Sequence, residues 1–189
     1  MGTRHLTAVV VDRQFKIAQY GQWDGYFSGA GVKIAKFIET MDFYQFKENV
    51  RHCNFITPEQ VKNKWIECGA KPDETFVNFA VADKFNQQYP ELDRNIGSGI
   101  LELVAKQGGM LLQDEIDFVG DSLFCEYAYV LDLDEEVLEL YRGFNKKGLP
   151  KKQKRFRQYP KQDKYYPVRL VKEVEFRKVT QKLIADLEK

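Results

Sequence analysis

The segment QYGQWDGY, residues 19–26, brings aromatic rings, amides and a carboxylate together around two glycines. Such side chains could form a ligand pocket, in which the rings stack on a planar group and the polar groups hydrogen-bond to its edge, as in nucleobase recognition. The alternative is a tight Asp-Gly turn, with the tryptophan packed on the core and the aspartate bonded to the local backbone. The residues of the predicted pocket are Gln19, Tyr20, Gln22, Trp23, Asp24 and Tyr26.

A glycine-rich turn, SGAG at 28–31, follows this segment and leads into the helical pattern VKIAKFIETM. The first N–H groups of a helix have no partner within the helix and lie at the positive end of its dipole, so they accept a phosphate or carboxylate readily. Ser28 is the predicted N-cap and a candidate ligand contact. The turn lacks both the P-loop ending and the GxGxxG pattern. We therefore expect either an anion contact or a simple connection here.

Arg4 and His5 stand at the start of the first predicted strand, so their side chains point to opposite faces. In a binding site, we expect Arg4 to neutralise a phosphate and His5 to line the ligand. In a hydrolase acting on a nucleotide or an amide, His5 and Asp24 are the candidate acid/base groups. His5-x-Thr is half of a two-histidine phosphoesterase pattern, but no Ser or Thr stands two positions after His52. Because no catalytic pattern is complete, the sequence favours binding over turnover.

The segment 142–164 is strongly basic: it holds 10 of the 29 Lys and Arg residues and one of the 28 Asp and Glu residues. Its mixture of cations with Phe and Tyr suits nucleic acid or phosphate, with Lys154, Arg155 and Arg157 as candidate contacts. The longer segment 143–167 contains three of the six prolines and little hydrophobic periodicity, so we predict a mobile loop. It could close as a lid over an anionic ligand. The alternative is a solvated connection that neutralises an acidic body.

Cysteine and histidine are too few and too scattered for the common metal centres. The cysteines Cys53, Cys68 and Cys125 form no CxxC pair, so we expect reduced, buried thiols in a cytosolic protein. The two histidines exclude a site with three histidine ligands. We predict no metal and no cofactor. The sequence has neither a run of 18 apolar residues, which a membrane span needs, nor the start of a signal peptide.

The hydrophobic pattern predicts an α+β fold with a largely antiparallel sheet. Residues 6–11 and 15–20 predict a hairpin, and residues 123–131 and 137–142 predict a second one with an acidic turn. Residues 168–176 predict a last strand, which a short amphipathic helix follows. Helical periods and caps dominate residues 40–108, which we interpret as a helical layer or lobe. The length suits a single domain over residues 1–189.

The motifs GTRHLT, AQYGQWDGY and SGAGVKIAKFI, with CEYAYVLDLDEEVLELYRG and YYPVRLVKEVEF near the other end, resemble a family of uncharacterised proteins. That family is widespread in bacteriophages and also occurs in bacteria and fungi. Its usual turn has Pro where this sequence has Phe27. The resemblance implies no established reaction, but a phage setting suggests proteins that bind or destroy the nucleotide signals of bacterial immunity.

Three hypotheses on function follow from the sequence. The first is a cytoplasmic protein that binds and sequesters a nucleotide-like small molecule. The second is the hydrolase described above, and the third is a module that binds nucleic acid or protein through the basic segment. The sequence leaves the oligomeric state open, including a homo-oligomer.

Overall fold

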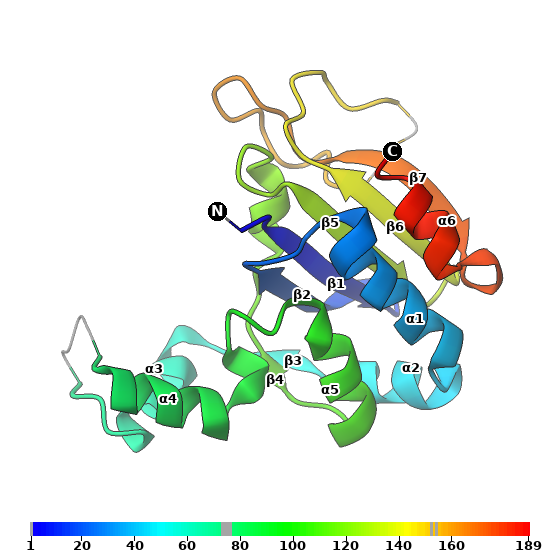
Figure 1. The fold of residues 1–189 in the computed structure, drawn as a ribbon. Helices are drawn as coiled ribbons and strands as arrows, with labels where there is room; N and C mark the ends of the chain where they lie inside the picture. The colour runs from blue at the N-terminus through cyan, green and yellow to red at the C-terminus, as the bar shows by residue number, and fades with distance from the viewer. Residues whose placement is uncertain (1, 73–76, 152, 154) are drawn as a thin grey trace.

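The computed structural model describes residues 2–72, 77–151, 153 and 155–189. Its main element is a five-stranded sheet with the strand order β2-β1-β5-β6-β7 (Figure 1). The central neighbours β1 and β5 are parallel, and the other neighbours are antiparallel. The predicted α+β class with a largely antiparallel sheet is therefore confirmed. The strands are β1 (His5–Val11), β2 (Gln14–Gly21), β5 (Tyr127–Asp132), β6 (Val137–Arg142) and β7 (Arg169–Glu175).

Strand β1 lies inside the sheet, between β2 and β5, and is buried along its whole length. Its sequence HLTAVVV shows little alternation because both of its faces are covered. The predicted hairpin of β1 with β2 is confirmed, and it turns at Asp12 and Arg13, whose φ angles are 52° and 61°. Two successive left-handed residues make the turn whose twist matches that of antiparallel strands.

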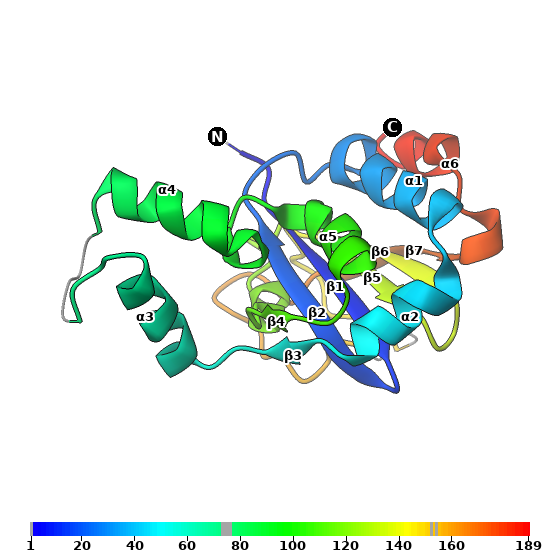
Figure 2. The ribbon, with the colours of Figure 1, turned by 90° about the horizontal axis from the view of Figure 1, so that it is seen from below.

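Four helices cover one face of the sheet, and the main hydrophobic core lies beneath them (Figures 1 and 2). The predicted cap at Ser28 is wrong, because a π-helical turn (η1, Phe27–Gly31) precedes the first helix and leaves Ser28 exposed without a capping hydrogen bond. The helices of this face are α1 (Val32–Thr40), α2 (Phe43–Arg51), α5 (Ile100–Gln107) and α6 (Gln181–Asp186).

An arm formed by α3 (Pro58–Glu67) and α4 (Phe79–Gln88) extends away from the sheet (Figures 1 and 2). At its base a small parallel sheet joins β3 (Asn54–Phe55) to β4 (Leu111–Leu112). The arm has a core of its own, in which the rings of Trp65 and Phe85 stack with centroids 3.7 Å apart. With α2 and α5, these elements form the helical part that the sequence predicts between residues 40 and 108.

Loop segments cover the opposite face of the sheet. Phe156, from the segment between β6 and β7, is fully buried there in a second hydrophobic core. The Gln153 amide fixes the same segment, because it donates to the carbonyl of Val168 and accepts from the N–H of Leu170. The described residues of 143–167 form no helix or strand, yet they pack on the sheet.

The remaining short helices of the described residues are 3₁₀ helices: η2 (Pro90–Leu92), η3 (Gly97–Gly99), η4 (Ile116–Gly120) and η5 (Phe176–Lys178).

The three cysteines are free and buried, as predicted. The helices within the described residues are all too short or too polar to cross a lipid bilayer. Those residues also contain no cluster of three or more His, Cys, Asp or Glu side chains that could hold a metal ion.

Candidate functional site

The side chains of residues 19–26 lie in several separate places. Gln19 is buried on the helix-covered face, whereas the Tyr20 ring lies against Phe118, with centroids 5.1 Å apart. The Tyr20 hydroxyl donates to Gln22 at 2.6 Å, and Arg94 donates to the same Gln22 oxygen. The structure thus brings Tyr20 and Gln22 together but places Gln19 elsewhere.

Trp23, Asp24 and Tyr26 form the exposed part of this segment, and the Tyr26 ring lies edge-on to Tyr127, with centroids 5.8 Å apart. Trp23 is 58% exposed, so the predicted packing of its ring on the core is not observed. Asp24 adopts a left-handed conformation with φ 59° and pairs with Lys33 at 2.7 Å. Its carbonyl accepts from Ala30 N–H, which fixes the turn. The turn interpretation therefore describes this part of the segment better than a pocket does.

Arg4 is also engaged within the protein. Its guanidinium lies 3.7 Å from the Glu126 carboxylate and 4.7 Å from the centre of the Phe124 ring. The predicted role of Arg4 as a phosphate contact therefore competes with an existing ion pair.

A cluster of buried polar side chains, His5, Thr7 and Gln19, lies on the helix-covered face. Thr7 stands directly opposite Gln19 in the β1–β2 register, and His5 stands opposite Gly21. Both ring nitrogens of His5, the Thr7 hydroxyl and the Gln19 carbonyl oxygen find no hydrogen-bond partner among the described residues. Burial lowers the pKa of His5 to about 4 and outweighs the charge of Asp24, so the imidazole is neutral at pH 7.

The basic segment is used mostly for structure. Arg155 is largely buried and pairs with Asp132 at 2.7 Å and with Glu139 at 2.6 Å. Arg157 donates to the carbonyls of Gln153 and Pro150. Both arginines are predicted ligand contacts, and their guanidinium groups already have partners within the fold. The third predicted contact, Lys154, lies outside the described residues.

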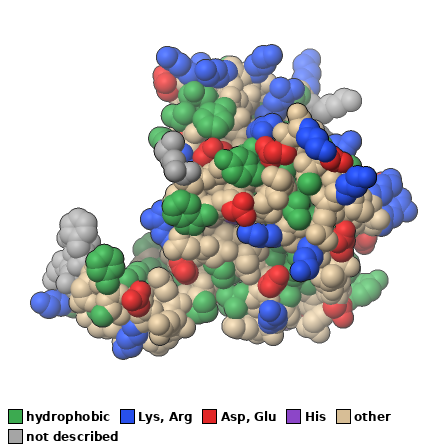
Figure 3. All heavy atoms as spheres, viewed as in Figure 1, with side chains coloured by type: hydrophobic (Ala, Val, Ile, Leu, Met, Phe, Trp, Pro, Cys, Tyr) green, Lys and Arg blue, Asp and Glu red, His purple; other side chains and the backbone are tan. Residues whose placement is uncertain are grey.

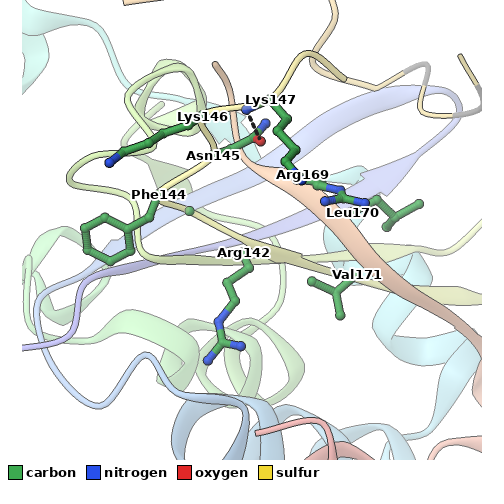
Figure 4. Close-up of a pocket in the computed structure, with 9 residues that line it drawn as sticks. Arg142, Phe144, Asn145, Lys146, Lys147, Arg169, Leu170 and Val171 are labelled. Atoms are coloured by element: carbon green, nitrogen blue, oxygen red, sulfur yellow. Dashed lines mark hydrogen bonds between the residues drawn. The ribbon is translucent and has the colours of Figure 1, made fainter. Parts of the chain in front are cut away.

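A basic pocket of about 490 Å³ lies where the segment after β6 passes the start of β7 (Figure 4). Figure 3 shows Lys and Arg side chains gathering along the edge of the molecule where Figure 1 places the loops between β6 and β7. None of the described residues that line this pocket is acidic. They are Arg142, Gly143, Phe144, Asn145, Lys146, Lys147, Arg169, Leu170 and Val171.

Strand pairing and one buried amide position the cations of the basic pocket. Arg142 and Arg169 are direct neighbours across β6 and β7. Asn145 is buried, donates to the Pro167 carbonyl at 2.8 Å and accepts from Lys147 N–H at 3.2 Å. In Figure 4, Lys147 and Arg169 lie close together, whereas Lys146 points away from them. Phe144 has a left-handed backbone, with φ 50°, and a half-exposed ring.

Arg142 also belongs to a second group, in which the Glu188 carboxylate is held. One Glu188 oxygen accepts from Arg142 at 2.8 Å and from the Tyr127 hydroxyl at 2.6 Å. The other accepts from Phe27 N–H, at the start of the glycine-rich turn, at 2.7 Å. Burial and the bond to Glu188 raise the pKa of Tyr127 to about 12, so its hydroxyl keeps its proton at pH 7. The chain's own carboxylate thus binds the residue before the glycine-rich turn, whereas the Gly29, Ala30 and Gly31 N–H groups bond to the carbonyls of Tyr26 and Asp24.

Arg169 and the pocket escaped the sequence analysis. Arg142, Lys146 and Lys147 stood out in the basic segment, but Arg169 lies beyond it, within the last predicted strand. Only the pairing of β6 with β7 brings Arg169 opposite Arg142. No local sequence pattern predicts that pairing. The two arginines near the ends of two adjacent predicted strands were nevertheless a signal from which a basic site could have been predicted.

Comparisons with protein-family models, with curated proteins and with solved structures found no match for this chain. The family resemblance carried by the N-terminal and C-terminal motifs therefore stays a prediction.

Proposed function

We propose that this protein binds an anionic, nucleotide-like small molecule in the basic pocket and holds it without turnover. The observation that carries the proposal is a pocket whose described lining has four cationic side chains and no acidic one, in a chain of net charge +1. A concave site with one sign of charge concentrates ligands of the opposite sign.

The electrostatics of the pocket favour an added anion. Like charges on neighbouring strands are destabilising when their side chains lie together; Arg142 is the register partner of Arg169, but its side chain extends away from it, and Lys147 lies closer to Arg169. Glu188 neutralises Arg142, but Lys147 and Arg169 have no ion pair with any described residue. A phosphate between Lys147 and Arg169 would offset their repulsion. Arginine can bind its oxygens through two hydrogen bonds at once, which gives the contact a defined geometry.

Aromatic surface beside the cations suits a nucleotide better than inorganic phosphate. Phe144 is half exposed at the rim, where it could stack on a base, an interaction that contributes roughly 1–3 kcal/mol. The described residues that line the pocket include no His, Asp, Glu, Cys, Ser or Thr. General acid/base and nucleophilic catalysis mostly use such groups, and the described lining offers only Lys146 and Lys147 for that role. This lining supports sequestration, which is the role that a phage setting would suggest.

The two alternative functions gain less support from the geometry. His5 is buried and Asp24 is exposed and paired with Lys33; the Asp24 charge acts on His5, but neither ring nitrogen of His5 has a hydrogen-bond partner among the described residues. For the nucleic-acid hypothesis, Arg155 and Arg157 are already engaged. Deleting the basic loop is no clean test of that hypothesis, because it would uncover the core around Phe156.

The test is a binding assay with 5′-AMP, ADP, a cyclic dinucleotide and ADP-ribose, by calorimetry and by the shift in melting temperature. Each ligand is then recovered and examined by chromatography. We expect at least one ligand to bind and to be recovered intact. The double variant Lys147→Ala/Arg169→Ala should lose at least tenfold in affinity, which corresponds to about 1.4 kcal/mol.

The matched control is Lys164→Ala/Lys182→Ala, which removes the same charge from exposed positions outside the pocket. Equal losses in both double variants would indicate diffuse charge attraction rather than this pocket. Consumption of a ligand would make the protein an enzyme and contradict the proposed sequestration.

A further inference from the structure

The Glu188 carboxylate rests on three donors that come from distant parts of the chain. They are the Phe27 N–H in η1, the Tyr127 hydroxyl in β5 and the Arg142 guanidinium in β6. A backbone N–H, a phenol and a guanidinium are all suited to an oxyanion, and a charged acceptor strengthens each bond. We call these three donors the anion seat.

The anion seat and the basic pocket share Arg142. Its guanidinium binds Glu188 and lies 5.3 Å from the centre of the Tyr127 ring, while the same residue lines the pocket. In Figure 4 its side chain extends from β6 to the side away from Lys147 and Arg169. One arginine therefore connects two places where an anion can bind.

The Glu188 side chain can leave its donors without opening the main core. Glu188 follows the end of α6, and Leu187 rather than Glu188 packs on the main core. The Arg142 and Glu188 side chains are 47% and 24% exposed. Partly exposed ion pairs hold their geometry weakly, because water competes for both partners and salt screens them. The carboxylate is thus a replaceable occupant.

We propose that the anion seat is a second anion subsite of the ligand site and that Glu188 is its internal, displaceable occupant. This inference rests on the proposed function and extends it to the class of ligand. The ligand carries two separate anionic groups, of which one binds between Lys147 and Arg169 and the other replaces the Glu188 carboxylate. Glu188 lowers the apparent affinity by the fraction of time for which it fills the seat.

The experiment compares the wild type with Glu188→Gln, using adenosine 3′,5′-bisphosphate as the probe with two phosphates and 5′-AMP as the probe with one. If Glu188 fills the seat for about nine-tenths of the time, the amide variant should bind the bisphosphate about tenfold more tightly. Affinity for 5′-AMP should change much less. The matched control is Asp186→Asn, which removes the same charge two residues away, from a side chain that pairs with Lys189.

A direct measurement is the amide resonance of Phe27 in the wild type, because its N–H is bound to Glu188 in the free protein. We expect saturation with the bisphosphate to shift this resonance and 5′-AMP to leave it nearly unchanged. Melting curves of the free variants verify that both are folded.

The outcomes separate this inference from the proposed function. Binding by the wild type with no gain in Glu188→Gln, or an equal gain in Asp186→Asn, overturns the second subsite and leaves the basic pocket standing. Binding by Glu188→Gln alone supports the inference in its strongest form, with the seat almost always filled. No binding of either probe to any variant overturns both proposals.

Discussion

Two groups of buried polar side chains lie on opposite faces of the central sheet, and they differ in charge and in hydrogen bonding. On the loop-covered face, Arg155 pairs with Asp132 and Glu139, and the Tyr141 hydroxyl donates to Glu139 at 2.6 Å. On the helix-covered face, the His5 ring nitrogens and the Thr7 hydroxyl have no hydrogen-bond partner among the described residues. The first group is charged and fully paired, and the second is neutral and unpaired.

The difference follows from the energetics of burial. An isolated buried charge is so unfavourable that it survives only when paired, whereas an unpaired neutral group costs about 1–3 kcal/mol and can be tolerated. Arg155 therefore identifies a structural network, which holds the loop between β6 and β7 on the sheet. The polar atoms of His5 and Thr7 contribute no hydrogen bond that holds the fold together.

The largest expected effect comes from breaking the paired group. Arg155→Met should lower the free energy of unfolding by about 3–5 kcal/mol, because Asp132 and Glu139 would keep their charges in a buried site without a cation. Urea unfolding measures the change. Lys164→Met, an exposed lysine of the same segment, is the control and should be nearly neutral. A loss below about 1 kcal/mol would mean that water screens the network despite its burial.

A smaller effect is expected from the pH dependence of the unpaired group. The pKa of His5 is about 4 in the folded protein, against an ordinary value of 6.5. Between these values the unfolded chain binds a proton that the folded protein does not, so the free energy of unfolding falls as the pH falls from 6.5 to 4. Linkage gives a maximum loss of about 3 kcal/mol from this residue, and its contribution is constant above that window.

The measurement is urea unfolding at several pH values for the wild type, His5→Gln and His52→Gln. His5→Gln removes the titrating group and should flatten the slope between pH 6.5 and 4. His52 is exposed, so its variant should follow the wild type. An unchanged slope in His5→Gln would show that the imidazole reaches solvent or gains a partner.

The sequence predicted the elements of both regions but not their partners. Strand β6 matches its predicted range, because apolar residues alternate with Glu139 between clear turns. The strand before it was predicted over 123–131, yet β5 begins at Tyr127, because the Phe124 and Cys125 N–H groups bond to the Asp121 carbonyl and form a turn. Local patterns describe strands well and their neighbours poorly.

The partners depend on strand order, which no local pattern contains. The acidic turn after β5 leaves Asp134, Glu135 and Glu136 exposed, but Asp132, at the end of the strand, is buried beneath Arg155. The parallel pairing of β1 with β5 joins residues more than a hundred positions apart and buries His5 and Thr7. The pairing of β6 with β7 places Arg142 opposite Arg169 in the register and brings together residues of the basic pocket. The candidate site was therefore predictable in its chemistry and largely unpredictable in its location.

The smallest expected effect, and the one that decides what the unpaired group is for, comes from Thr7→Val. This change keeps the branched shape and removes a buried hydroxyl that has no partner among the described residues. We expect the free energy of unfolding to rise by about 1 kcal/mol, because an unsatisfied buried polar group is destabilising. Thr180→Val is the opposite control, since the Thr180 hydroxyl caps α6 by accepting from Leu183 N–H, and its loss should destabilise by about 1 kcal/mol. If Thr7→Val destabilises like the control, then an ordered water or a ligand must satisfy Thr7 in solution. Thr7 would then be hydrogen-bonded in solution, like the charged side chains on the loop-covered face.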